Sequence, residues 1–355
     1  MLILSDGRRI GTVSGGCLEG EVCRKAWWYT EDGQASVRIY DTSSDDDAVW
    51  EFGLGCNGVV HVLFERVSDA GTQEMLRFVA ERRAARRPVA VATVVALREG
   101  SPGTLRCGAR LLFDAEGVSG GTLAGGRFEA LLHGLARDAW VQQKSQLVHL
   151  GADEAPEACD VFVEWIGTPP ALVVFGAGHD AQPVVRLAKG LGWHVTVADG
   201  RSNYATRQRF PEADVVQVLK PGQALQGIEI TRDTAVVMMT HNYPEDARLL
   251  GSILPAKPRY LGLLGPKSRA EELLEEVGLP VTGIDIHAPV GLDLGSDAPD
   301  SVALAIVAEI QAVLHGRAGG MLRMRQAPIH EPAHEIGAAN GSMAEIREAA
   351  ICDLG

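Results

Sequence analysis

The chain has 355 residues, of which 46% are hydrophobic and 22% are charged, as in a soluble globular protein with room for two or three domains. A formal net charge of -13 argues against nucleic acid or an anionic membrane as the main partner. The sequence has no apolar run of about 18 residues and predicts no membrane span. Six scattered cysteines without a C-x-x-C pair argue against a zinc ribbon or a disulfide scaffold, and favour a cytoplasmic protein with reduced thiols.

A glycine turn near the N-terminus organises the first unit. The segment S-G-G-C-L-E at 14–19 returns 110 positions later as A-G-G-R-F-E at 124–129, and each copy predicts a strand, a glycine turn and a helix. Gly15 and Gly16 let the backbone fold tightly and let a ligand approach Cys17. A thiol at a helix start feels the positive end of the helix dipole, which favours the reactive thiolate. The alternative is a glycine turn with a small buried cysteine.

The rest of the first half repeats the same plan. A second cysteine, Cys56, lies in the glycine turn 53–58, and a site built from Cys17 and Cys56 requires the two turns to converge. We interpret residues 1–67 and 88–166 as two related units of one α/β domain. Relative to the second unit, the first lacks its opening strand, so the given chain is expected to start inside a unit. The pattern also predicts a helix and five strands, at 68–87 and at 37–40, 59–64, 89–96, 109–114 and 160–164.

The second half begins after a short stiff linker, Gly167–Pro170. The apolar strand 172–175 enters a G-x-G-x-x-A turn formed by Gly176, Gly178 and Ala181, and a helical pattern and a second strand follow. This context is typical of a dinucleotide-binding Rossmann fold, in which the turn and the helix start receive phosphate. At the end of the second strand, Asp199 is placed to bind a ribose hydroxyl, and Arg201 could meet a phosphate instead. Whether a dinucleotide binds is a separate question.

Two later strands, 235–239 and 259–264, end at polar loops that would line the same crevice, because ligands of open α/β sheets lie beyond the carboxyl ends of the strands. In the first loop, His241 is a candidate acid or base; the alternative is a histidine that bonds a loop carbonyl. In the second loop, Lys267, together with Arg269, could hold an anion, although a helix start explains that turn equally well.

The predicted fold class is therefore α/β: an N-terminal α/β domain of two repeated units (1–166), then a Rossmann-like parallel-sheet domain with a C-terminal helix (171–317) and a mobile tail (318–355). The tail contains H-E-x-x-H at 330–334. We do not interpret it as a zinc site, because Pro332 disrupts the helix that such a motif needs.

Taken together, these motifs resemble the XdhC/CoxI family, accessory proteins for xanthine dehydrogenase and related molybdenum hydroxylases. The matching segments are 11–19, 53–56, 103–109, 175–179, 240–242, 265–267 and 289–295. The resemblance implies that the protein binds the molybdenum cofactor, supports its sulfuration with a cysteine desulfurase, and delivers it to a hydroxylase of the xanthine, aldehyde or CO dehydrogenase type. Carried over by position, Cys17 and Cys56 are the cofactor-binding thiols. The sequence departs from the family pattern at Asn57, where a third glycine is usual, and in the missing opening strand.

Two functions follow from these patterns. The first is a cofactor chaperone and maturation factor that catalyses no turnover itself. The second is an NAD(P)-dependent oxidoreductase that uses the crevice at Gly176. The first accounts for both cysteine turns, whereas the second accounts for the Rossmann half alone. A homodimer would be an ordinary assembly for either.

Overall fold

The structure of the protein is a computed structural model that describes residues 1–13, 17–41, 59–98, 105–123, 126–151, 154–220, 222, 225, 227–281, 283–295, 297–326 and 334–337. The side chains of residues 17, 41, 126 and 334–337 are not among the parts described. The described residues form two compact units: one runs to Thr168 and includes the strand 334–337, and the other begins at Pro169. Within these ranges, no helix combines the length and the apolar character that crossing a membrane requires.

The first unit contains three α-helices, a 3-10 turn and ten strands within the described ranges. In chain order they are β1 (Leu2–Ile3), β2 (Arg9–Ile10), α1 (Cys17–Lys25), η1 (Trp28–Thr30), β3 (Ser36–Asp41), β4 (Val59–Phe64), α3 (Ala70–Ala84), β5 (Val89–Leu97), β6 (Arg110–Asp114), β7 (Gly117–Gly121), α4 (Gly126–Gln142), β8 (Gln146–Leu150), β9 (Cys159–Ile166) and β16 (His334–Gly337).

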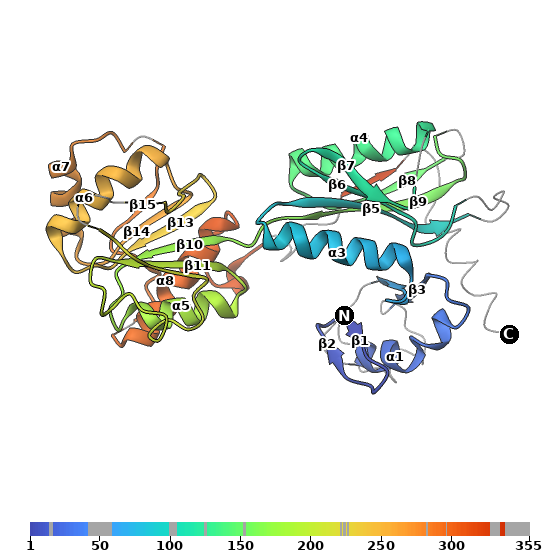
Figure 1. Cartoon of the computed structure of the whole chain (residues 1–355), viewed down its shortest axis with the longest axis horizontal. Helices are drawn as coiled ribbons and strands as arrows, with labels where there is room; N and C mark the ends of the chain where they lie inside the picture. The colour runs from blue at the N-terminus through green and yellow to red at the C-terminus, as the bar shows by residue number, and fades with distance from the viewer. Residues whose placement is uncertain are drawn as a thin grey trace. The chain divides into compact units, whose positions relative to one another are not determined.

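Its larger sheet has the order β16-β8-β9-β5-β6-β7 and lies between two helices (Figure 1). Alternate side chains of the strands face opposite sides of a sheet. On one side α4 buries Leu132 against Ala92 and Val161, and on the other α3 packs Phe78 against Leu112. Both faces are therefore apolar, which explains why β5 reads as a nearly continuous hydrophobic run.

The β1–β2 hairpin and α1 follow the same plan as β6, β7 and α4, at the offset of 110 residues seen in the sequence. Leu2 pairs with Ile10 in the first hairpin, and the equivalent Leu112 pairs with Gly120 in the second. The glycines that turn the two hairpins have positive φ at equivalent positions: Gly7 and Gly117, and Gly11 and Gly121. The local backbone of the two hairpins thus repeats together with the sequence. We further predict that residues 1–22 superpose on residues 111–132.

The two pairs of later strands also correspond. Tyr40 of β3 faces Val60 of β4, as Leu150 of β8 faces Cys159 of β9. In the second repeat (88–166) β5 lies between β9 and β6. Among the described residues of the first repeat (1–67), no strand occupies the equivalent place between β4 and β1, and the strands there form two separate two-stranded sheets.

Among the observed strands that were not predicted from the sequence are β8, β15 (Ile286–His287) and β16, and β16 is the most unexpected of them. Residues 334–337, inside the segment expected to be a mobile tail, form β16 and pair in parallel with β8. An edge strand of four residues is held by backbone hydrogen bonds, which leave no periodic signature in the side chains. His334, the last residue of the H-E-x-x-H match, therefore lies in a strand, while 330–333 are outside the described residues.

The second unit consists of four α-helices, two 3-10 turns and six strands in its described part. They are β10 (Ala171–Phe175), α5 (Ala181–Gly190), β11 (His194–Asp199), β12 (Val215–Val218), β13 (Thr234–Met238), α6 (Tyr243–Ile253), η2 (Leu254–Ala256), β14 (Tyr260–Leu263), α7 (Lys267–Val277), β15 (Ile286–His287), α8 (Pro299–Leu314) and η3 (Leu322–Met324).

All six strands are parallel, in the order β12-β11-β10-β13-β14-β15. Helices α5 and α8 cover one face, with Val184 and Ile306 in the core, and α6 and α7 cover the other, with Leu250 and Leu273 (Figure 1). A parallel sheet covered by helices on both faces is a doubly wound fold. The structure confirms the predicted α/β class and the Rossmann-like domain.

Candidate ligand-binding crevice

The topology of the second unit places a crevice at the ends of β10 and β13. From β10 the chain builds β11 and β12 on one side and β13 to β15 on the other, so the strand order reverses between β10 and β13. Ligands of open α/β sheets bind at such a switch point, outside the carboxyl ends of the strands. The loops that follow β10, β11, β13 and β14 carry the site residues that the sequence predicts there.

Gly176 lets β10 turn within contact of β13. Its φ is +115°, and a Cβ at this position would lie 2.5 Å from the carbonyl carbon of Met239. Its N–H donates to the carbonyl of Ala198 on β11 at 2.8 Å. At the end of the turn, Ala181 is fully buried and starts α5 against the sheet. The backbone therefore adopts the close turn that the G-x-G-x-x-A pattern predicts.

Asp199 is engaged by groups of the chain itself. Its carboxylate is 5% exposed and accepts hydrogen bonds from the backbone N–H of Ala177 at 2.7 Å and of Arg201 at 2.8 Å. The Arg201 guanidinium adds two more, at 3.0 and 2.7 Å. Burial alone would raise the pKa of Asp199, but these hydrogen bonds outweigh it and hold the pKa below its usual value. The carboxylate expected to bind a ribose hydroxyl thus already accepts four hydrogen bonds from Ala177 and Arg201.

Arg201 and a second arginine share one aromatic ring. The Arg201 guanidinium carbon lies 4.2 Å from the ring centre of Tyr204, and that of Arg209 lies 5.0 Å from it. Arg209 also donates to the carbonyl of Ala177 at 3.3 Å, so Ala177 is held through both its N–H and its C=O. Tyr204 and Arg209 were not predicted as site residues, because no motif marks the segment after Arg201.

His241 bonds a carboxylate and not a loop carbonyl. Its Nε2 lies 2.9 Å from Oδ2 of Asp180, which is the residue just before α5. The pair joins the loop after β10 to the loop after β13, across the switch point. His241 has φ +55°, an uncommon conformation for a residue other than glycine. Asp180 lies within the G-x-G-x-x-A turn but was not predicted as a site residue, because the motif accepts any residue at its position.

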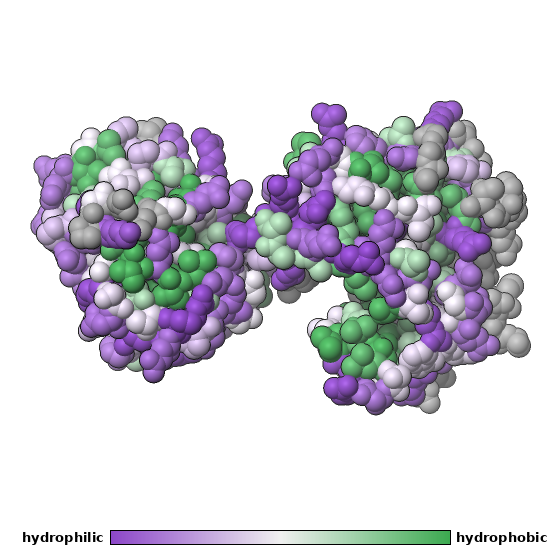
Figure 2. Space-filling view, in the orientation of Figure 1, coloured by the Kyte–Doolittle hydropathy of each residue, from purple (hydrophilic) through white to green (hydrophobic). Residues whose placement is uncertain are grey.

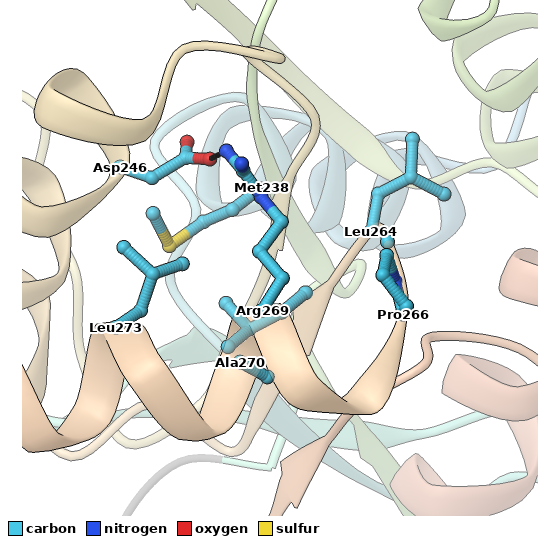
Figure 3. Close-up of a pocket in the computed structure, with 9 residues that line it drawn as sticks. Met238, Asp246, Leu264, Pro266, Arg269, Ala270 and Leu273 are labelled. Atoms are coloured by element: carbon cyan, nitrogen blue, oxygen red, sulfur yellow. Dashed lines mark hydrogen bonds and ion pairs between the residues drawn. The ribbon is translucent and has the colours of Figure 1, made fainter.

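The loop after β14 carries one exposed and one engaged cation. Lys267 starts α7, is 75% exposed and lies 3.8 Å from Glu271. Arg269 points inward and donates to Asp246 at 2.7 Å (Figure 3). Thr240 donates to the same carboxyl group at 2.5 Å. The pocket beside this pair measures about 10 Å³, room for roughly one water molecule. Of the two cations, Lys267 is the one that faces solvent.

The first unit places Cys17 at the start of α1. The N–H of Val13 donates to Glu19 in the first turn of this helix at 3.2 Å. Leu18 and Val22 then bury the helix against Val62 of β4. The Cys17 side chain and the other predicted residues of this site, Gly15, Gly16 and Cys56, lie outside the described parts of the chain.

The three other described cysteines occupy different surroundings. Cys159 is fully buried in the core of the larger sheet, and burial raises its pKa to about 11. Cys107 is half-buried beside the carbonyl of Val95, and burial raises its pKa to about 11 as well. Cys23 lies within α1 and is half-buried. A raised pKa disfavours the thiolate, so Cys107 and Cys159 are poor metal ligands. Among the described residues, no group of three or more histidine, cysteine, aspartate or glutamate residues could hold a metal ion.

Comparison with known proteins supports one family over both units. The model of the XdhC and CoxI family matches residues 1–41 and 82–151, and that of the XdhC Rossmann domain matches 172–310. A Bacillus subtilis protein, named as a probable subunit of xanthine dehydrogenase, is 32% identical over 310 residues, which are 87% of this chain and 86% of that protein.

Two Escherichia coli relatives cover less of the chain, and one solved structure covers most of it. The uncharacterised Escherichia coli protein YqeB is 29% identical over 72% of this chain and 48% of its own length. The molybdenum cofactor insertion chaperone PaoD of the same bacterium is 27% identical over 40% of this chain and 39% of its own. A crystal structure from Bacillus halodurans, titled as a xanthine dehydrogenase, is 28% identical, with a TM-score of 0.71 over 89% of this chain and 85% of that one. On these matches, the chain belongs to the XdhC and CoxI family.

Proposed function

We propose that this protein is an accessory factor that binds the molybdenum cofactor and serves the maturation of a molybdenum hydroxylase of the xanthine dehydrogenase type. The observation that carries the proposal is the family match over both units, which includes the cysteine turn at the start of α1. One of the relatives, PaoD of Escherichia coli, is named as a molybdenum cofactor insertion chaperone. The supporting chemistry lies in the thiols of the first unit.

Cys17 lies at the N-terminal end of a helix. It is the first residue of α1, where the N–H groups of the first turn have no partner within the helix. The positive end of the helix dipole favours a thiolate there. Thiolates suit soft metal centres and sulfur chemistry, which a molybdenum centre and its sulfuration require. We infer that Cys17 and Cys56 together hold the cofactor, and that a cysteine desulfurase supplies the sulfur.

Delivery to a hydroxylase needs a surface for a protein partner. Around η1 and the β1–β2 hairpin the first unit leaves large apolar side chains in solvent: Trp28 is 64% exposed and Ile10 is 62% exposed. Figure 2 shows hydrophobic surface gathered around the β1–β2 hairpin of this part of the chain. Exposed apolar surface of this kind is typical of protein contacts. We assign this part of the chain to the contact with the hydroxylase.

An NAD(P)-dependent oxidoreductase has less support. The Gly176 turn has the expected geometry, but the carboxylate that should receive the ribose is taken by Arg201 and Ala177. A ribose hydroxyl would have to displace a charged, bidentate donor. The turn thus supports the Rossmann fold more strongly than it supports turnover with a nicotinamide cofactor.

The test is cofactor retention by cysteine variants. Protein co-expressed with the molybdenum cofactor pathway is purified, and molybdenum and the oxidised pterin are measured per chain. We expect the Cys17→Ala, Cys56→Ala double variant to retain at least about tenfold less cofactor than the parent, a loss of about 1.4 kcal/mol of binding. Cys23→Ala, six residues along the same helix, and Cys107→Ala are the matched controls and should retain it.

Circular dichroism and a thermal melt establish that each variant is folded. If the folded double variant holds as much cofactor as the parent, the thiol site is not at these cysteines. If the parent itself retains none, the proposed function is wrong.

A further inference from the structure

The carboxylate of Asp180 lies inside the glycine turn. Asp180 precedes the first residue of α5, with φ -70° and ψ -24°, and its side chain does not cap the helix. It folds back instead over Gly178, where its Oδ1 lies inside 3.0 Å of the position that a Cβ would occupy. The missing side chain of Gly178 thus makes room for a carboxylate of the same loop.

His241 holds this carboxylate in place from the other side of the crevice. The hydrogen bond of 2.9 Å between Nε2 and Oδ2 fixes the second oxygen of Asp180. Asp180 is 25% exposed and His241 is 61% exposed, so the pair lies at the mouth of the crevice and not in the core. The backbone of His241 adopts a sparsely populated conformation at φ +55° while its ring reaches across the switch point.

This position is the one that the diphosphate of a dinucleotide occupies in a Rossmann fold. The phosphates approach the glycines closely and accept from the N–H groups at the helix start. In this protein the carboxylate of Asp180, the residue just before α5, already lies against Gly178. Like charges brought together in a binding site repel each other and weaken binding. A second anionic group would have to push Asp180 out and break its bond to His241.

We propose that Asp180 excludes diphosphate-bearing nucleotides from this turn, and that His241 is the positioning residue that keeps the carboxylate there. The G-x-G-x-x-A turn then has a structural role in the Rossmann fold, while the negative charge of Asp180 determines which ligands can bind at the turn. This inference does not depend on the molybdenum cofactor, because it concerns nucleotides alone. It predicts that one substitution creates nucleotide binding in a chain whose backbone already suits it.

The experiment is a calorimetric titration of the full chain with NADPH, NADH and ADP at fixed ionic strength. Asp180→Asn keeps the size of the side chain and removes its charge. We expect this variant to bind each nucleotide at least about tenfold more tightly than the parent does, a gain of about 1.4 kcal/mol. Asp180→Ser should give a similar gain and serves as the second variant if the first folds poorly.

Two further variants locate the effect. Asp300→Asn removes the same charge from the first turn of α8, where Asp300 is 79% exposed and bonds Arg186 at 3.0 Å, and should change no affinity. His241→Gly suits the positive φ and frees Asp180 to move, so its gain should be smaller than that of Asp180→Asn. A larger gain would mean that the ring and not the carboxylate blocks the turn.

Unchanged or weaker nucleotide binding by both Asp180 variants overturns the proposal. Tight NADPH binding by the parent that Asp180→Asn leaves unaltered overturns it as well. Neither result bears on cofactor retention by the cysteine variants, so a failure here is distinguishable from a failure of the proposed function.

Discussion

Replacing Arg110 by methionine is expected to lower the free energy of unfolding by about 3 kcal/mol, because it leaves the carboxylate of Glu65 buried without its partner. Arg110 is the first residue of β6 and is 2% exposed, and its guanidinium bonds Glu65, which follows β4 and is 16% exposed. This pair joins the end of the first repeated unit to the second. Urea unfolding at pH 7.5 measures the loss.

Two comparisons separate burial from charge. Arg87→Met removes an exposed ion pair with Glu116, whose side chains are 55% and 64% exposed, and should cost less than about 1 kcal/mol. The double variant Arg110→Met, Glu65→Leu replaces both charges by apolar groups and should recover most of the stability, since a buried pair contributes little net free energy. A single Arg110→Met variant as stable as the parent would contradict this account.

The cost should also depend on pH. Burial raises the pKa of Glu65, and the charge and hydrogen bond of Arg110 oppose that rise in the parent. Without Arg110 the pKa of the folded state moves further above that of the unfolded chain. Stability from the protonated acid is then fully present below the unfolded pKa and is lost as the pH rises through the folded pKa. The deficit of Arg110→Met should therefore be smaller at pH 5 than at pH 7.5.

The Rossmann unit could be predicted from sequence because its signals are local. A continuous apolar strand, a glycine turn and a helical period follow one another within about twenty residues, and each has one structural meaning. The repeat was also visible, since it is an ungapped offset. Leu18 and Val22 of α1 and their counterparts Phe128 and Leu132 of α4 are buried in the two cores, as a repeated packing requires.

What the sequence could not show depends on contacts between distant residues. Asp180 and His241 are 61 positions apart, and Arg110 and Glu65 are 45 apart. In each case neither residue belongs to a sequence motif that would identify its partner. The two residues come together only because the fold brings their segments into contact. Asp199 illustrates the limit best: its place at the end of β11 was predicted, but the residue that occupies its carboxylate, Arg201, was interpreted as a separate phosphate contact.

The largest backbone effect is expected at Gly176, where alanine should destabilise the second unit by about 2–6 kcal/mol. The φ of +115° lies in a region that side chains other than glycine rarely adopt, which alone costs about 1–3 kcal/mol. A Cβ would also lie 2.5 Å from the carbonyl carbon of Met239 and 2.9 Å from the amide nitrogen of Thr240. Both neighbours are backbone atoms at the end of β13, so relief requires a shift of the strand itself, with a further cost of about 1–3 kcal/mol.

Two glycines nearby provide matched controls. A Cβ on Gly178 would meet the end of the Asp180 side chain, which can rotate away at the cost of its bond to His241. Gly178→Ala should therefore cost less than Gly176→Ala. Gly190, the last residue of α5, has no atom within 4 Å of its Cβ position, and alanine there should stabilise the helix by up to about 1 kcal/mol. Hydrogen exchange read by mass spectrometry should show faster exchange across β10 and β13 in Gly176→Ala and little change in the controls. Equal protection from hydrogen exchange in all three variants would contradict this account. It would mean that the backbone at Gly176 does not approach the end of β13 as closely as the structure shows.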